Sequence, residues 1–223
     1  MGDTVIFLDA NVLASPVTRT LVIATGRADG LRLTWSSHVE AEADRHARGA
    51  ATRTSVVRRD ILGMELSESA RTTDGLLTGT SGDRQVIADA IRADARYLVT
   101  SDVDDFATDD LRANGLSAVN PDYFMALRSS ERAYREAVRT LAGAMKNPPR
   151  TEAEVHRMLG RRHPHVAARF ADAYGTAPAR PDPDQPSVLF RGVICVRCEA
   201  KLDHGESLRL GLCIEHRRSD DSS

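Results

Sequence analysis

The sequence predicts an α/β fold in which a parallel sheet carries helices on both faces. Short apolar runs of strand type alternate with longer segments of helical periodicity over residues 4–127. This alternation favours parallel strands joined by crossover helices. Acidic residues follow where several of these strands end. The composition changes beyond residue 127, which indicates a helical extension and then a small C-terminal module.

The segment 81–106 shows the alternation most clearly. Its first half repeats apolar residues at helical spacing, at Val86, Ile87, Ala90 and Ile91. Residues 97–99 form an apolar run of strand type, which the polar residues up to Asp102 end. Asp83 lies where the preceding helix begins. Because ligands bind beyond the carboxyl ends of parallel strands, we expect the carboxylates of Asp83 and Asp102 to meet at one crevice.

The other elements follow in the order strand, helix, strand, helix. Strand-type runs cover residues 4–8, 31–35 and 117–119. Helical patterns cover residues 12–24, 37–48, 52–65 and 104–114, and another helix begins at Asn120-Pro121. We expect Pro16 to kink the first of these helices in its first turn, and Ser36 or Ser37 to cap the second.

Two details of the region 52–82 can be checked against the structure. The helix over residues 52–65 is expected to turn four apolar side chains inward: Val56, Val57, Ile61 and Leu62. The segment 67–82 is rich in Ser, Thr and Gly and is expected to be a loop. Within it, Leu76-Leu77 is a candidate for a brief strand.

Four acids lie at or near the strand ends: Asp9, Glu42, Asp83 and Asp102. Asp9 also suits the N-cap of the following helix, and the two roles are compatible. Glu40 and Glu42 lie about 200° apart on a helix, so only one of them can face the crevice. Carboxylates this close raise one another's pKa unless a cation neutralises them. Oxygen ligands without His or Cys favour Mg²⁺ or Mn²⁺, and such a site suits phosphodiester hydrolysis.

Composition excludes several classes of protein. No apolar run approaches the ~20 residues of a membrane span, and the N-terminus lacks a secretory signal pattern, so we expect a cytoplasmic protein. The net charge of −2 conceals a segregation of charge. Residues 1–127 carry 13 basic and 19 acidic side chains, net −6, whereas residues 128–169 carry 10 and 4, net +6. The basic segment is either the solvated face of helices or a flank that holds phosphate.

Four motifs over residues 4–127 carry a family resemblance. They are FLDANVL, WSSHVEAEADRH, GDRQVIADAI and YLVTSDVDDF, in this order along the chain. Together they resemble a PIN domain, a family in which many members are the ribonuclease toxins of VapC-type toxin–antitoxin pairs. The resemblance implies a parallel sheet with helices on both faces, and cleavage of RNA by acids that bind Mg²⁺ or Mn²⁺.

Carried onto this sequence, the resemblance assigns the acids at Asp9, Glu42, Asp83 and Asp102. Asp9, Asp83 and Asp102 would hold the metal, and Glu42 would be a ligand or would orient the attacking water. Glu42 is preferred to Glu40 because the family acid lies about a turn and a half after the Ser that ends the strand. Asp105 is a candidate fifth member. The ligands or the water would be oriented by Asn11 and by Thr100 or Ser101.

Residues 128–177 resemble a helical extension found on some of these toxins. The segment 130–145 is amphipathic, and its apolar stripe contains Tyr134, Val138, Leu141 and Met145. Thr151 and Glu154 form a capping box, so Glu154 supports a helix and is not a site candidate. Three histidines are dispersed among arginines and are expected at the surface: His156, His163 and His165. Residues 178–188, within a proline-rich stretch, are expected to be an extended linker.

The tail, residues 189–218, contains every cysteine of the chain. Cys195-x-x-Cys198 is followed after fourteen residues by Cys213-x-x-His216, a spacing typical of a zinc-ribbon-like module. His204 could substitute for His216, but it lacks the paired spacing. A closed set of four ligands favours a structural Zn²⁺, which would stabilise a module too small for its own apolar core.

These patterns lead to one main hypothesis and two alternatives. The main hypothesis is a metal-dependent endoribonuclease that leaves a 5′-phosphate and a 3′-hydroxyl, expected to be a toxin with a cognate antitoxin protein and able to form a homodimer. The first alternative is an adaptor in which the acidic site is idle and the zinc module binds nucleic acid or protein. The second is a nuclease that cuts DNA by the same chemistry.

Overall fold

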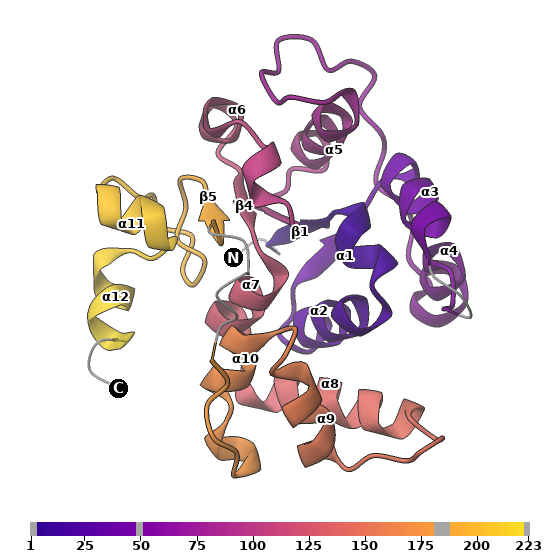
Figure 1. Cartoon of the computed structure of the whole chain (residues 1–223). Helices are drawn as coiled ribbons and strands as arrows, with labels where there is room; N and C mark the ends of the chain where they lie inside the picture. Colours follow the sequence, from indigo (N-terminus) through magenta and orange to yellow (C-terminus); the bar gives the residue numbers. More distant parts are fainter. Residues whose placement is uncertain (1–3, 48–50, 181–187, 221–223) are drawn as a thin grey trace.

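The chain forms a five-stranded sheet with helices packed around it (Figure 1). The structure, a computed structural model, describes residues 4–47, 51–180 and 188–220. The strands are β1 (Val5–Leu8), β2 (Arg32–Thr34), β3 (Tyr97–Val99), β4 (Ser117–Val119) and β5 (Phe190–Arg191). Their order is β2-β1-β3-β4-β5; the first four are parallel, and β5 runs antiparallel to β4. The predicted α/β class and parallel sheet are therefore confirmed.

Helices cover both faces of the sheet, as predicted. In Figure 1, α2 (Pro16–Ala28) and α7 (Pro121–Arg128) lie on one side of the strands, and α5 (Ser81–Arg92) and α6 (Thr108–Ala113) lie on the other. Every residue of β1, β3 and β4 is buried, because the helices shield both faces. Strands covered in this way read as continuous apolar runs, which is why the sequence located them closely.

The predicted helix over residues 12–24 is interrupted by Pro16. A short helix α1 (Ala10–Ala14) ends at Ser15, and α2 begins at Pro16. Ser15 has extended backbone angles (φ −92°, ψ 105°), because a following proline disfavours the helical region. α1 begins earlier than the predicted helix, and α2 ends later than it. The break between them falls at the proline, as expected.

The segment 52–65 departs further from prediction. It contains a short helix α4 (Thr54–Val56) and a wider π-helical turn η1 (Val57–Leu62), preceded by α3 (Ser37–His46), which Ser36 caps. The inward orientation predicted for Ile61 is wrong, because its side chain is 68% exposed. The wider turn changes the angle between successive side chains, so a 3.6-residue pattern does not apply to it. Arg58 on this turn instead points inward and donates to the carboxylate of Glu40.

The loop before α5 contains no strand at Leu76-Leu77. The backbone N–H groups of Leu77 and Thr78 donate to the carboxylate of Asp110, and Leu77 exposes its side chain. The predicted helix over residues 104–114 is split into a 3₁₀ turn η2 (Val103–Asp105) and α6. Gly115 follows α6 with φ +61°, the left-handed conformation that glycine adopts without strain.

The extension forms α8 (Glu131–Ala144), α9 (Glu152–Leu159), α10 (Pro164–Arg169) and a 3₁₀ turn η3 (Asp172–Tyr174). The predicted capping box of Thr151 and Glu154 is present. The surface positions predicted for His156 and His163 are wrong, since each side chain is 2% exposed. His156 Nδ1 lies 3.0 Å from the hydroxyl of Tyr134, and His163 Nε2 lies 3.2 Å from Thr18 Oγ1. These hydrogen bonds make burial of the two imidazole rings possible. The arginines nearby in the sequence give no indication of these partners.

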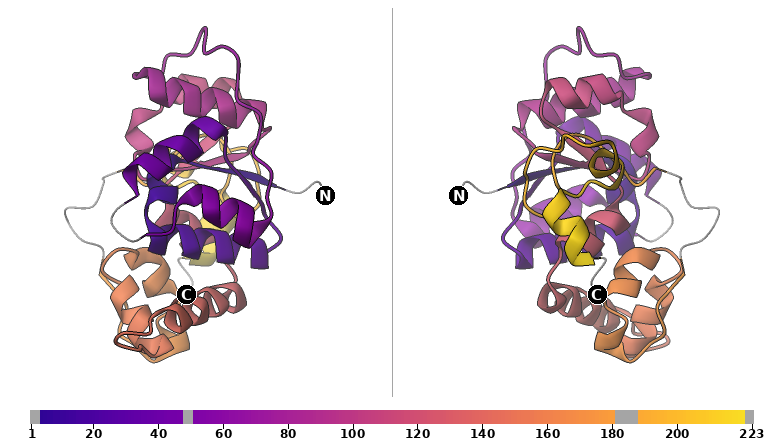
Figure 2. Two further views of the ribbon diagram at one scale, coloured as in Figure 1. Left: turned by 90° about the vertical axis from the view of Figure 1, so that its right-hand side faces the viewer. Right: turned by 90° about the vertical axis from the view of Figure 1, so that its left-hand side faces the viewer.

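The tail adds β5 to the sheet edge and continues as α11 (Gly205–Leu210) and α12 (Ile214–Asp220). Figure 2 shows it against the β4 edge, and its apolar residues belong to the same core cluster as the sheet. The expected boundary between residues 178 and 188 lies mostly outside the described residues. Among the residues described, no helix has the length and apolar character needed to cross a bilayer.

Candidate metal sites

Asp9 follows β1 directly and lies at the edge where the parallel strands end. Its side chain is 8% exposed and caps α1, since Oδ1 accepts the backbone N–H of Ala10 at 2.6 Å. Its other oxygen, Oδ2, accepts the hydroxyl of Thr100 at 2.7 Å. Thr100 follows β3, the neighbouring strand. The predicted capping role is therefore observed, and Asp9 lies at the end of β1 as expected.

Asn11 links the ends of β1 and β3. Its side-chain amide nitrogen lies 2.9 Å from Asp9 Oδ2 and 3.0 Å from Asp102 Oδ2. Its oxygen accepts the backbone N–H of Ser101 at 3.1 Å, which fixes the orientation of the amide. Thr100 Oγ1 also accepts the backbone N–H of Asp102 at 3.1 Å. The predicted supporting residues therefore hold two of the candidate acids beside each other.

The electrostatics connect these acids to the others. The pKa of Asp9 is raised to about 6, mainly by burial and also by the charges of Glu42 and Asp102, against hydrogen bonds from Thr100 and Ala10 that lower it. Burial also raises the pKa of Asp105, with contributions from Asp83, Asp102 and Asp104. The charges of Glu42 and Asp102 therefore act on Asp9, and those of Asp83 and Asp102 act on Asp105, so negative charge accumulates where a cation would be favoured.

The structure separates Glu40 from Glu42. Glu40 is 8% exposed and accepts hydrogen bonds from Trp35 Nε1 at 3.1 Å and Arg58 Nε at 2.6 Å. These partners occupy its carboxylate, so Glu40 has a structural role. Glu42 is half-buried, and its nearest ion-pair partner is His38 at 4.0 Å. Glu42 is thus the acid of α3 that remains accessible to the crevice.

The acidic oxygens are not gathered as tightly as a closed metal site requires. Among the described residues, one group of three or more acidic, cysteine or histidine side chains brings its ligand atoms within 4.8 Å of one another, and it lies in the tail. Thr80 caps α5 by accepting the backbone N–H of Asp83, and its hydroxyl donates to the Asp83 carboxylate. Among the described residues, Asp83 makes no hydrogen bond with Asp9 or Asp102. The donor set at the crevice suits Mg²⁺ or Mn²⁺ by its chemistry, because it consists of carboxylate and amide oxygens.

The tail contains the tighter cluster, formed by Cys195, Cys198, Cys213 and His216. His216 Nδ1 lies 3.5 Å from Cys195 Sγ and 3.2 Å from Cys213 Sγ, and the sulfurs of Cys198 and Cys213 are 3.7 Å apart. Sulfur ligands 2.3 Å from a tetrahedral zinc are about 3.8 Å apart, so these spacings fit zinc. The predicted ligand set could therefore hold a metal such as Zn²⁺.

Local structure explains how the four ligands meet. Cys195 N donates to Ala200 O at 2.8 Å, which closes a tight turn around the first cysteine pair, and Glu199 in this turn has φ +63°. Cys213 immediately precedes α12, and His216 lies in its first turn. Cys213 and His216 are therefore held by the start of a helix. A zinc ribbon would instead hold its second ligand pair in a tight turn like that of Cys195 and Cys198.

The pKa of the Cys195 thiol is lowered, which favours the thiolate that binds a cation. Burial alone would raise the pKa of Cys195, but backbone N–H groups of Cys213, Cys198 and Arg197 lower it to about 7. His204 pairs with Asp203 and is not part of the cluster. The histidine that lies with the three cysteines is therefore His216, and the alternative ligand His204 lies outside the cluster.

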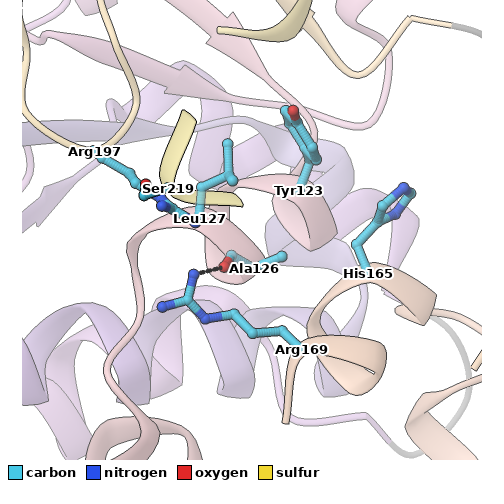
Figure 3. A pocket seen from close by; sticks show the side chains of 7 residues that line it. All are labelled: Tyr123, Ala126, Leu127, His165, Arg169, Arg197 and Ser219. Atoms are coloured by element: carbon cyan, nitrogen blue, oxygen red, sulfur yellow. Dashed lines mark hydrogen bonds between the residues drawn. The ribbon is translucent and has the colours of Figure 1, made fainter. Parts of the chain in front are cut away.

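A basic groove lies between the sheet domain, the extension and the tail (Figure 3). Its volume is about 530 Å³, and it is lined by Tyr123, Ala126, Leu127, His165, Arg169, Arg197 and Ser219. Arg169 Nη1 donates to Ala126 O at 2.5 Å, and His165 Nδ1 lies 2.8 Å from Asp122 Oδ2. The positive charge predicted for residues 128–169 thus reaches a concave surface, where Arg197 of the tail adds to it.

Comparison of the chain with protein-family models, curated proteins and solved structures gives no significant match. The family resemblance of residues 4–127 therefore rests on the four sequence motifs.

Proposed function

We propose that this chain is a Mg²⁺- or Mn²⁺-dependent endoribonuclease with a PIN-like sheet domain, and that it is the toxin of a toxin–antitoxin pair. The observation that carries the proposal is the amide of Asn11, which lies within hydrogen-bond distance of both Asp9 and Asp102. Two acids held at neighbouring strand ends match the place where parallel α/β sheets bind ligands. The raised pKa of Asp9 indicates a carboxylate that a cation would stabilise.

Each acid has a role in this proposal. Asp9, Asp83 and Asp102 bind the metal ion, which supplies polarisation of the phosphoryl group and a lowered pKa for the attacking water. Glu42 is a ligand or orients that water. Asn11 and Thr100 fix Asp9 and Asp102, and Asp105 adds negative charge beside Asp83. Cleavage leaves a 5′-phosphate and a 3′-hydroxyl.

RNA is the proposed substrate because of the charge distribution. The extension carries a net charge of +6 over residues 128–169, from 10 basic and 4 acidic side chains. Arg169 and Arg197 bring two guanidinium groups to the lining of the groove. A chain that cuts a polyanion needs acidic ligands for its cation and basic groups for the phosphates, and RNA binding is expected to weaken as salt increases.

The test is Asp9→Asn, assayed for Mn²⁺-dependent cleavage of total RNA with the ends mapped. Asp9→Asn should abolish cleavage, because the amide cannot supply the anionic ligand. The matched control is Asp94→Asn, since Asp94 is an exposed acid with φ 54°, a conformation that asparagine also adopts. Equal cleavage by Asp9→Asn and the parent chain would refute the proposal.

A second candidate function is an adaptor that binds nucleic acid or protein through the Cys₃His tail. It is favoured by the tighter gathering of ligand atoms in the tail than at the acids. If Mn²⁺ neither raises the melting temperature nor supports cleavage while RNA binding persists, the adaptor is the better description.

A further inference from the structure

Arg191 connects the tail to the loop that follows β3. It lies on β5, opposite Ala118 of β4. Its guanidinium donates to the backbone carbonyl of Phe106 at 2.8 Å and to that of Asp104 at 3.2 Å. It also pairs with the carboxylate of Asp104 at 2.9 Å. One side chain therefore reaches three acceptors of residues 102–106, which we call the acidic loop.

The acidic loop carries two members of the candidate site. Asp102 precedes the 3₁₀ turn η2, and Asp105 ends it. The turn itself has few internal bonds: Asp105 N donates to Asp102 O at 3.1 Å, and Phe106 N donates to Val103 O at 3.5 Å. A turn this short is held mainly by what surrounds it, and its carbonyls accept from Arg191.

The carbonyl contacts matter more than the ion pair. The side chain of Asp104 is 52% exposed, so its pairing with Arg191 is screened by water and contributes little. Hydrogen bonds from a charged donor to backbone carbonyls fix the path of the chain instead. Arg191 therefore acts on the shape of the loop, and through it on the direction of Asp102 and Asp105.

A short, sheet-bound stretch of chain connects Arg191 to the Cys₃His cluster. The strand β5 has only two residues, and Gly192 follows it so closely against Ser117 that an added Cβ would lie 2.1 Å from Ser117 Oγ. Ser117 Oγ accepts the backbone N–H groups of Val193 and Ile194, and the hydroxyl of Tyr97 donates to Cys195 O at 2.6 Å. Cys195 is thus attached both to the sheet and to the metal ligands.

We propose that Arg191 is a positioning residue through which the metal-bound tail holds the acidic loop in the shape that the divalent-cation site requires. This inference rests on the proposed function for its consequence in catalysis, although the positioning itself is a property of the loop. It assigns a purpose to the tail: the Cys₃His site sets the affinity of the acidic site for its cation.

The test compares three full-length variants: Arg191→Ala, Arg191→Lys and Arg209→Ala. Arg209 is an exposed arginine on α11 of the same tail and serves as the matched control. Hydrogen exchange of the amides of Asp105 and Phe106 is the first readout, and the dissociation constant for Mn²⁺ alone, measured by electron paramagnetic resonance, is the second. A third arm treats the parent chain and Arg191→Ala with a chelator that removes zinc before the exchange measurement.

Arg191→Ala should accelerate exchange at these two amides by roughly tenfold and weaken Mn²⁺ binding several-fold, with β1 and β3 amides unchanged. Arg191→Lys should recover part of both effects, because one ammonium can still donate to the loop. Arg209→Ala should change neither. Zinc removal should accelerate the same amides in the parent chain but add little in Arg191→Ala, since the connection is already absent.

Unchanged loop exchange in Arg191→Ala, or zinc removal that spares the loop in the parent chain, would overturn the inference. If no form of the protein binds Mn²⁺ or cuts RNA, the proposed function fails, and the exchange data still decide whether Arg191 positions the loop. The two failures are therefore distinguishable.

Discussion

Arg58 holds Glu40 by two hydrogen bonds, from Nε to Oε2 at 2.6 Å and from Nη2 to Oε1 at 3.2 Å. The pair joins the π-helical turn η1 to α3, and Trp35 donates to the same carboxylate. Both side chains are mostly buried, with 18% of Arg58 and 10% of Glu40 exposed. A neighbouring acid two residues along the helix, Glu42, lacks such partners, which separates a structural glutamate from a candidate site glutamate.

Exchanging each glutamate for glutamine should separate the two roles. Glu40→Gln leaves Arg58 without its counter-charge, so the free energy of unfolding should fall by roughly 2 to 3 kcal/mol, while RNA cleavage persists. Glu42→Gln should leave the free energy of unfolding within about 0.5 kcal/mol and reduce cleavage by roughly 100-fold. Urea unfolding and cleavage rates check both. The reverse pattern would assign the site to Glu40.

Asn11→Ala should weaken the acidic site without unfolding the protein. The substitution removes the amide that lies between Asp9 and Asp102, and leaves the backbone N–H of Ser101 without its acceptor. Loss of a residue that orients metal ligands costs about 10- to 100-fold in metal affinity or activity. The dissociation constant for Mn²⁺ should rise by that factor. Wild-type affinity in Asn11→Ala would show that the acids do not depend on this amide.

Two buried groups should give the metal-free protein opposite responses to acid. Burial lowers the pKa of His163 from 6.5 to about 4, and Nδ1 has no hydrogen-bond partner to stabilise a second proton. The unfolded chain therefore takes up the proton first as pH falls, so stability is lost between about pH 6.5 and 4. Burial raises the pKa of Asp9 to about 6, so here the folded chain takes up the proton first. Asp9 therefore adds stability between about pH 6 and 4.

From pH 7 to 5, His163 should cost roughly 2 kcal/mol of stability and Asp9 should add roughly 1 kcal/mol. Substituting one of the two residues leaves the pH dependence that the other contributes. The free energy of unfolding of Asp9→Asn should fall more steeply toward pH 5 than that of the parent chain, and that of His163→Gln should rise relative to it. Chemical unfolding at both pH values in the presence of a chelator checks the signs. Parallel pH profiles for all three proteins would contradict both assignments.

Sequence patterns located what depends on local chemistry. The strands at residues 97–99 and 117–119 were predicted to the residue, because fully buried strands are continuous apolar runs ending in polar residues. The N-caps at Asp9 and Thr151 were likewise predicted from side chains that bond to the next turn. The Cys₃His cluster of the tail was predicted from its spacing, since paired ligands need only a short turn.

What depends on distant contacts could not be predicted. Arg191, Ser117 and Tyr97 join the tail to the sheet, but nothing in their own segments indicates partners 76 to 98 residues away. The burial of His163 depends on Thr18, which lies in another helix. The π-helical turn η1 places Ile61 in solvent because backbone bonding in this segment departs from the period assumed for it.

Loss of one metal ligand in the tail should destabilise the whole protein and not the tail alone. The tail shares the sheet's core through Phe190, Val193 and Ile194, and β5 pairs with β4. Cys213→Ser should abolish the single bound zinc and lower the melting temperature by roughly 6 to 12 °C, as expected for a loss of ~3 kcal/mol in a chain of this size. His204→Ala is the matched control, because this exposed histidine pairs with Asp203 outside the cluster. It should keep both the zinc and the melting temperature of the parent chain. Metal analysis by mass spectrometry and thermal unfolding check the prediction. A separate early transition for the tail, with the main transition unmoved in Cys213→Ser, would show that the module folds independently of the sheet.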